Sequence, residues 1–131
     1  MTAIYVDTSA VGRVLLGEST APAIVRALDT FDENVASRLL RVELRRLASR
    51  HDLLETAAEL LDTIALVPLD ERVLDAAETV QPASIGTLDA VHLVTAVRLA
   101  EAGLLDTVLT YDARLADGAR LHGLTVLSPV R

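Results

Sequence analysis

Three residue types are missing from this chain of 131 residues: cysteine, lysine and tryptophan. Without cysteine, the fold contains neither disulfide bonds nor thiolate metal sites, which fits the cytoplasmic location that we expect. All 12 basic residues are arginines. The absence of lysine excludes a P-loop lysine, a Schiff base, and the lysine that receiver domains and haloacid-type phosphatases require.

Aromatic side chains and long hydrophobic runs are also scarce. Phe, Trp and Tyr make up 2% of the residues, whereas hydrophobic residues make up 51%, mostly as Ala, Val and Leu. We expect an aliphatic core and, in the apolar excess, a surface for a protein partner. No apolar run approaches the roughly 20 residues that a membrane-spanning helix needs, and no secretory signal is visible at the start.

Acidic residues outnumber basic ones, 19 to 12, so the net charge of the chain is −7. Taken alone, this charge argues against unspecific binding of phosphate groups. It does not exclude a nucleic-acid enzyme, since bound metal ions can supply the positive charge that the chain lacks.

Short apolar runs alternate with longer amphipathic stretches, a pattern typical of an α/β domain with a mainly parallel sheet. The length fits a single domain. The pattern predicts strands at residues 3–6, 34–38, 64–69, 107–111 and 124–128. It predicts helices at residues 9–16, 21–29, 39–51, 52–63, 70–80, 88–102 and 113–119.

A carboxylate follows two of the predicted strands. Asp7 comes directly after the apolar run Ile4-Tyr5-Val6, and Asp112 comes directly after TVLTY. Ligands of open parallel sheets bind outside the carboxyl ends of the strands, so both acids indicate a site there. Aspartate is also a preferred helix N-cap, which explains each of the two residues equally well on its own.

Two further acids lie on predicted helices. Glu43 has leucines three and four residues before it and four residues after it, so it lies in or beside an apolar stripe. An edge position from which the side chain reaches solvent or an arginine is the simpler explanation. Asp89 lies in the first turn of an almost wholly apolar helix that Thr87 can cap, where the helix dipole favours an anion.

The four acids together predict more than each does alone. If Asp7, Glu43, Asp89 and Asp112 converge, their charges raise one another's pKa values unless a cation neutralises them. With no lysine present, a hard divalent cation, Mg²⁺ or Mn²⁺, is the natural counter-ion for such oxygen ligands. Metal sites of this kind activate water and stabilise charge on a phosphodiester during hydrolysis.

Several stretches of the chain resemble one known family. The chain resembles the PIN-domain ribonucleases over nearly its whole length. The resemblance lies, in order along the chain, in the stretches IYVDTSA, RVELRR, TLDAVHLVTA and VLTYDARLADGARLHGLTVL. The resemblance is strongest to the VapC toxins of bacterial VapBC toxin–antitoxin modules. An aspartate after a strand is common, so the specific signal is the ordered set of four acids with DTSA, LDAVHL and TYDARL.

The resemblance implies that residues 1–131 form one PIN-like nuclease domain, a three-layer α/β/α fold with a central, mainly parallel sheet of about five strands. It implies a type II toxin that hydrolyses RNA with Mg²⁺ or Mn²⁺. It also implies a cognate antitoxin, a homodimer, and a dimer of toxin–antitoxin heterodimers. A catalytically silent PIN-fold binding or scaffold module is the alternative, which the presence of all four acids disfavours.

The family's four acidic residues match Asp7, Glu43, Asp89 and Asp112. By this resemblance, Asp7 and Asp89 are the principal metal ligands. Glu43 holds a metal or orients the attacking water, and Asp112 completes the pocket directly or through water. Asp117 adds a fifth nearby acid, so the choice between Asp112 and Asp117 stays open.

Other polar residues are assigned supporting parts. Ser9 and Thr110 match small polar residues that lie beside the pocket in the family, a position from which they can hydrogen-bond the carboxylates or a metal-bound water. His92, three residues after Asp89, is interpreted as a structural or supporting histidine rather than as a metal ligand. Several arginines have two equally good explanations: they line the path by which RNA approaches, or they lie on helix faces exposed to solvent. They are Arg13, Arg38, Arg41, Arg45, Arg46 and Arg114.

Overall fold

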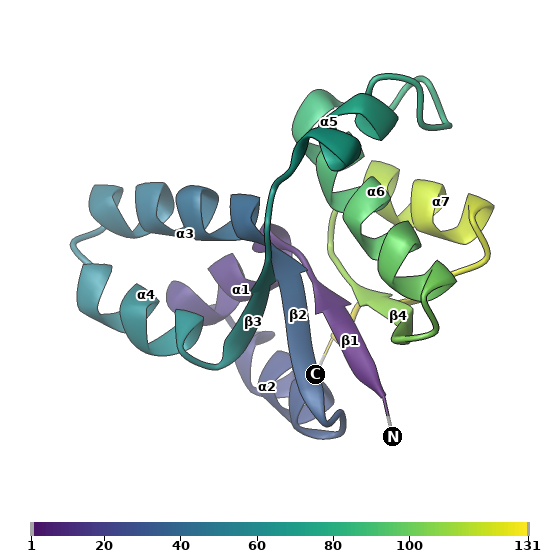
Figure 1. Cartoon of the computed structure of the whole chain (residues 1–131). Helices are drawn as coiled ribbons and strands as arrows, with labels where there is room; N and C mark the ends of the chain where they lie inside the picture. Colours follow the sequence, from purple (N-terminus) through teal and green to yellow (C-terminus); the bar gives the residue numbers. More distant parts are fainter. Residues whose placement is uncertain (1, 131) are drawn as a thin grey trace.

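The computed structural model describes residues 2–130, which form a five-stranded parallel sheet with helices on both faces (Figure 1). The strands are β1 (Ala3–Val6), β2 (Glu33–Ser37), β3 (Ile64–Val67), β4 (Leu105–Leu109) and β5 (Thr125–Leu127). The helices are α1 (Thr8–Leu15), α2 (Ala21–Asp29), α3 (Arg38–Arg50), α4 (Leu54–Leu61), α5 (Glu71–Ala77), α6 (Thr87–Glu101) and α7 (Ala113–Leu121). The predicted α/β fold is therefore confirmed.

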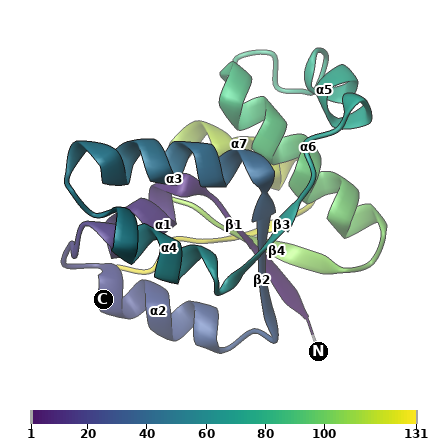
Figure 2. The ribbon, with the colours of Figure 1, turned by 60° about the vertical axis from the view of Figure 1, so that its left-hand side comes forward.

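Side chains of β1 alternate between two cores, as the period of two in a strand requires. Ile4 and Val6 pack with residues of α1, α2, α3 and α4, whereas Tyr5 packs with residues of α6 and α7. Figures 1 and 2 show the first four helices on one face of the sheet and α6 and α7 on the other. Helix α5 covers α6, where Val73 packs against Val91 and Val94.

Strand order places a switch point beside β1. The order across the sheet is β3-β2-β1-β4-β5, so the chain first builds outward from β1 on one side and then on the other. In open α/β sheets, the crevice at such a switch point is the usual ligand site. The ends of β1 and β4 are joined there by a hydrogen bond from the Asp7 N–H to the Leu109 carbonyl, 3.3 Å.

Two local expectations near this switch point are wrong. The fourth strand ends at Leu109, so Thr110 and Tyr111 separate it from Asp112. The chain leaves the sheet there because the Tyr111 N–H donates to the Ser9 hydroxyl, 2.8 Å, instead of to a strand. Gly86, and not Thr87, is the N-cap of α6, and no side chain supplies a capping bond.

Helix α6 is buried on all sides over one stretch, with residues 90–96 all buried. This confirms the burial expected from its apolar sequence. Asp89 lies immediately before the stretch and is half-buried. Across residues 2–130, no helix has the length and hydrophobicity to cross a membrane.

Candidate active site

Asp7 is the most buried acid of the site. It follows β1 in the N-cap position of α1, but its side chain makes no capping bond. Its side chain is 3% exposed, and the Ser9 hydroxyl donates to Oδ1 at 2.7 Å. Burial raises the pKa of Asp7, and the hydrogen bond from Ser9 opposes this shift. A helix cap therefore does not explain this carboxylate.

Asp89 and Asp112 meet beside Asp7. Asp112 caps α7, because its Oδ1 accepts from the Leu115 N–H at 2.8 Å, whereas Asp7 makes no such bond to α1. Burial, the negative charges of Asp112 and Asp7, and a hydrogen bond with Asp112 together raise the pKa of Asp89 to about 6. Asp7 and Asp112 thus both repel Asp89 at the carboxyl edge of β1 and β4.

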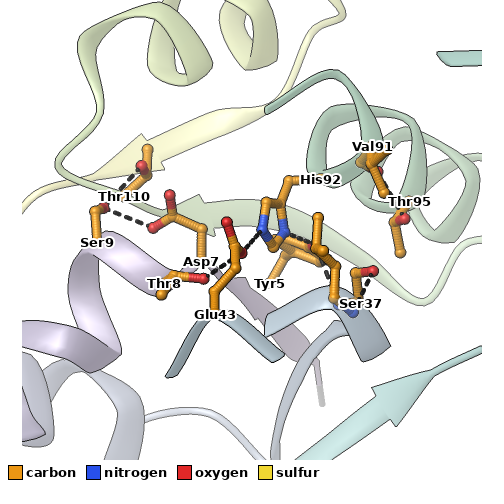
Figure 3. A network of polar contacts seen from close by, with 11 residues as sticks. Tyr5, Asp7, Thr8, Ser9, Ser37, Glu43, Val91, His92, Thr95 and Thr110 are labelled. Carbon is orange, nitrogen blue, oxygen red and sulfur yellow. Dashed lines mark hydrogen bonds and ion pairs between the residues drawn. The ribbon is translucent and has the colours of Figure 1, made fainter. Parts of the chain in front are cut away.

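Glu43 approaches from α3 on the other face of the sheet. Its Oε1 accepts two hydrogen bonds, from the Thr8 hydroxyl at 2.6 Å and from Nε2 of His92 at 2.7 Å (Figure 3). Burial raises the pKa of Glu43, but the hydrogen bonds from His92 and Thr8 outweigh it, so the net shift is downward. Glu43 is therefore ionised, and its partner is a histidine rather than an arginine.

A pair of hydroxyl groups joins Asp7 to the loop after β4. The Ser9 hydroxyl lies 3.3 Å from that of Thr110, which accepts from the Asp112 N–H at 3.0 Å. The Ser9 proton goes to Asp7, and hydrogen bonds from the hydroxyls of both Ser9 and Thr110 lower the pKa of Asp7 against the larger effect of burial. Ser9 and Thr110 thus lie beside the carboxylates, and they fix the loop that carries Asp112.

The choice between Asp112 and Asp117 now has a geometric basis. The Asp117 side chain is 78% exposed and lies 3.6 Å from the guanidinium of Arg120, one turn further along α7. Asp112 is half-buried and close enough to Asp89 to raise its pKa. The geometry therefore favours Asp112 as the fourth acid.

Sequence reasoning missed two members of the site, Thr8 and Tyr5. Thr8 stands in the DTS sequence directly after β1, where each of two adjacent hydroxyls serves a different carboxylate. Two adjacent hydroxyl residues directly after an acid could have predicted such contacts from the sequence, because their side chains can bond to that acid or to groups beside it. Nothing in the sequence distinguishes Tyr5 from an ordinary core residue.

The donor chemistry of the site fits a hard divalent cation. Asp7, Asp89 and Asp112 offer only oxygen atoms, and a cation would relieve the repulsion that raises the pKa of Asp89. Among residues 2–130, no three His, Asp or Glu side chains are already arranged to hold a metal ion. Binding of such an ion would therefore require these carboxylates to move closer together.

Comparison with known proteins agrees with this arrangement. A family model described as PIN domain matches residues 4–121. Ribonuclease VapC46 of Mycobacterium tuberculosis is 37% identical over 131 residues, which cover 98% of this chain and 99% of that protein. Ribonuclease VapC47 of the same species is 37% identical over 133 residues and 96% of both chains.

A solved structure also shares the fold. A toxin–antitoxin complex from Klebsiella pneumoniae contains a chain with a TM-score of 0.72 and 16% sequence identity, which covers 99% of each chain. At this identity, the likeness supports the fold alone. The family match and the two relatives, which span nearly all of the sequence, confirm the predicted family: the chain belongs to the PIN-domain family and, within it, to the VapC ribonucleases.

Proposed function

We propose that this chain is the toxin of a type II toxin–antitoxin module, an endoribonuclease that hydrolyses RNA phosphodiester bonds. The observation that carries the proposal is the convergence of Asp7, Asp89 and Asp112 at the switch point of the sheet, with Glu43 beside them. The relatives named ribonucleases support the activity. The assignment as a toxin follows from the resemblance to the VapC toxins of VapBC modules, and the solved complex agrees with it in fold.

Mg²⁺ or Mn²⁺ would be held by Asp7 and Asp89 as principal ligands, with Asp112 and Glu43 completing the set. When bound, such an ion polarises the phosphodiester and activates water. The ionised Glu43 accepts a proton from, or orients, the attacking water. The hydroxyls of Ser9 and Thr110 keep the Asp7 carboxylate oriented and help to keep it ionised.

The partners follow from the same proposal. A cognate antitoxin blocks the site, and the toxin forms a homodimer that assembles as a dimer of toxin–antitoxin heterodimers. Residues 1–131 act as one nuclease domain. Light scattering on the chain purified alone and co-expressed with the product of the neighbouring gene measures these assemblies.

RNA cleavage tests the proposal directly. Purified protein with Mn²⁺ is expected to cut total cellular RNA at a small set of sites, which mapping of the new 5′ ends will locate. An excess of EDTA is expected to stop cleavage, because the carboxylates alone cannot offset charge on the reacting phosphate. Cleavage that continues in EDTA would contradict metal dependence, whereas a pure protein without cleavage under any metal would favour the silent scaffold.

An arginine-lined hollow on α3 is the proposed contact for the RNA backbone. It encloses about 560 Å³, and its arginines have no ion-pair partner within residues 2–130. The arginines that line it are Arg38, Arg41, Arg45, Arg46 and Arg50. Arg13 is engaged elsewhere, since its guanidinium lies 3.8 Å from the centre of the Tyr111 ring.

Loss of one of these arginines should reduce the salt dependence of RNA binding. Arg45→Ala is expected to lower the slope of log K against log salt by about 0.7, the value for one phosphate contact with a single strand. Arg72→Ala, which changes an exposed arginine on α5, is the matched control and should leave the slope unchanged. Equal slopes for wild type and Arg45→Ala would contradict the proposal that this hollow contacts the RNA backbone.

A further inference from the structure

A buried chain of hydrogen bonds leads from the backbone of β2 to Glu43. The Ser37 N–H donates to the Tyr5 hydroxyl at 3.1 Å, and this hydroxyl lies 2.6 Å from Nδ1 of His92. Nε2 of the same imidazole lies 2.7 Å from Oε1 of Glu43. Figure 3 shows these contacts in line from Ser37 through Tyr5 and His92 to Glu43. Tyr5 is 0% exposed and His92 is 2% exposed, so water does not compete for these bonds.

The direction of each bond in this chain can be derived from its two ends. Oε1 of Glu43 already accepts from the Thr8 hydroxyl and offers only a lone pair to His92, so Nε2 of His92 must carry a proton. The Ser37 N–H can only donate, so the Tyr5 oxygen accepts there and its own proton is free to go to Nδ1. If Nδ1 were also protonated, the buried Tyr5 proton would lack an acceptor in this chain, which is unfavourable for a buried polar group.

The neutral imidazole with its proton on Nε2 is therefore the form that satisfies every member. The orientation of the Tyr5 hydroxyl, set by the backbone of β2, selects this tautomer. The tautomer in turn supplies a fixed donor to one oxygen of Glu43. Thr8 donates to the same oxygen, so Oε2 takes part in neither bond and stays available to another partner.

A core histidine that only fills space would not need this arrangement. His92 belongs to the part of α6 that is buried on all sides, yet both of its nitrogens have polar partners and one partner is a site carboxylate. Thr95, one turn later on the same helix, shows the simpler solution, because its hydroxyl bonds to its own helix at the Val91 carbonyl, 2.8 Å.

We propose that His92, with its tautomer fixed by Tyr5, is the positioning residue that holds Glu43 in the orientation needed to bind the metal ion and to direct water. This inference rests on the proposed function and adds two residues to its machinery. Neither residue touches the reacting atoms. Both act through Glu43, as partners of metal ligands commonly do.

Four variants of the full-length protein test this proposal. Tyr5→Phe removes one hydroxyl without changing the packing, and His92→Leu removes the donor to Glu43. His92→Gln returns an N–H at about the distance of Nε2 and serves as the rescue. Thr95→Val removes a buried hydroxyl from the same helix without touching the site and is the matched control. Thermal unfolding verifies that each variant is folded.

Two readouts do not depend on cleavage. In the metal-free protein, imidazole ¹⁵N chemical shifts should show the Nε2–H tautomer in wild type and a mixture in Tyr5→Phe. The dissociation constant for Mn²⁺ should rise about 10–100-fold in His92→Leu, less in Tyr5→Phe, and recover in His92→Gln. In the cleavage assay, kcat should fall in the same order while KM for RNA stays unchanged.

The outcomes separate this inference from the proposed function. If the wild type does not cleave RNA but Mn²⁺ affinity follows the expected order, the proposed activity fails and the positioning role stands. If the wild type cleaves RNA and folded His92→Leu matches Thr95→Val in Mn²⁺ affinity and kcat, the positioning role is overturned. An Nδ1–H tautomer in wild type would also overturn it.

Discussion

Asp7→Asn is expected to abolish RNA cleavage and, at the same time, to make the metal-free protein more stable. Asp7 is the most deeply buried of the four acids, and burial raises its pKa. Its ionised form is therefore disfavoured in the fold unless a cation is present. Asparagine has nearly the same shape, keeps an oxygen that accepts from Ser9, and carries no charge.

The two effects should be large and opposite in sign. Loss of a principal metal ligand is expected to reduce kcat by at least about 100-fold, the scale seen when one charge-stabilising group is removed. The free energy of unfolding in EDTA should increase by about 1–2 kcal/mol, because a buried charge has been replaced by a neutral group. Functional sites that hold such strain regularly trade stability for activity.

Urea unfolding in EDTA and single-turnover RNA cleavage measure the two quantities. Asp117→Asn removes an exposed acid from α7 and is the matched control, expected to change neither quantity noticeably. If Asp7→Asn cleaves RNA at the wild-type rate, Asp7 is not a metal ligand. If Asp7→Asn is inactive but less stable than wild type, loss of structure rather than loss of a ligand explains the inactivity.

Mn²⁺ is expected to stabilise the protein strongly at pH 7.5 and only weakly at pH 5. Burial and the neighbouring charges of Asp112 and Asp7 together raise the pKa of Asp89 from the ordinary value of 3.8 to about 6. At pH 5, Asp89 therefore holds a proton and competes poorly as a ligand. At pH 7.5, Mn²⁺ at 100 times its dissociation constant should add about 2.7 kcal/mol. For a chain of this size, that is a rise of roughly 10 °C in Tm.

Without metal, the contribution of Asp89 to the free energy of unfolding should decrease as pH rises, whereas the stabilisation by Mn²⁺ increases. Because the fold holds the Asp89 proton more tightly than the unfolded chain does, this group contributes stability that is fully present below pH 3.8. The contribution is lost as pH rises through about 6. For a half-exposed side chain we expect a loss of about 1–2 kcal/mol, after allowance for solvent screening.

Glu43 works against this trend, because its lowered pKa contributes stability above its ordinary value of 4.5 that is lost at lower pH. The difference between wild type and Asp89→Asn isolates the contribution of Asp89. Calorimetry from pH 4 to 8, with Mn²⁺ and with EDTA, measures both effects. Equal Mn²⁺ stabilisation of wild type and Asp89→Asn would contradict the proposed ligand, and none in wild type would favour the silent scaffold.

Most of the fold could be predicted because its signals are local. The period of apolar residues distinguishes strands from helices, and Asp70 caps α5 as its sequence position indicates, accepting from the Val73 N–H at 3.0 Å. The prediction places the fourth strand two residues late, because the β-branched, aliphatic and aromatic residues of TVLTY favour a strand throughout. Its true end depends on Ser9, which takes the Tyr111 N–H out of the sheet.

The sequence by itself determined the alternation of strands and helices, the family, and the four acids that are candidates for the site. These features can be recognised from residue types at fixed spacings along the chain. Only the tertiary structure decided what surrounds each acid: Asp7 is buried without capping, Asp112 caps α7, and Glu43 is held by a histidine. The contacts of His92 join residues 49 and 87 positions apart, and their partners and directions depend on orientation in space, which no local pattern records.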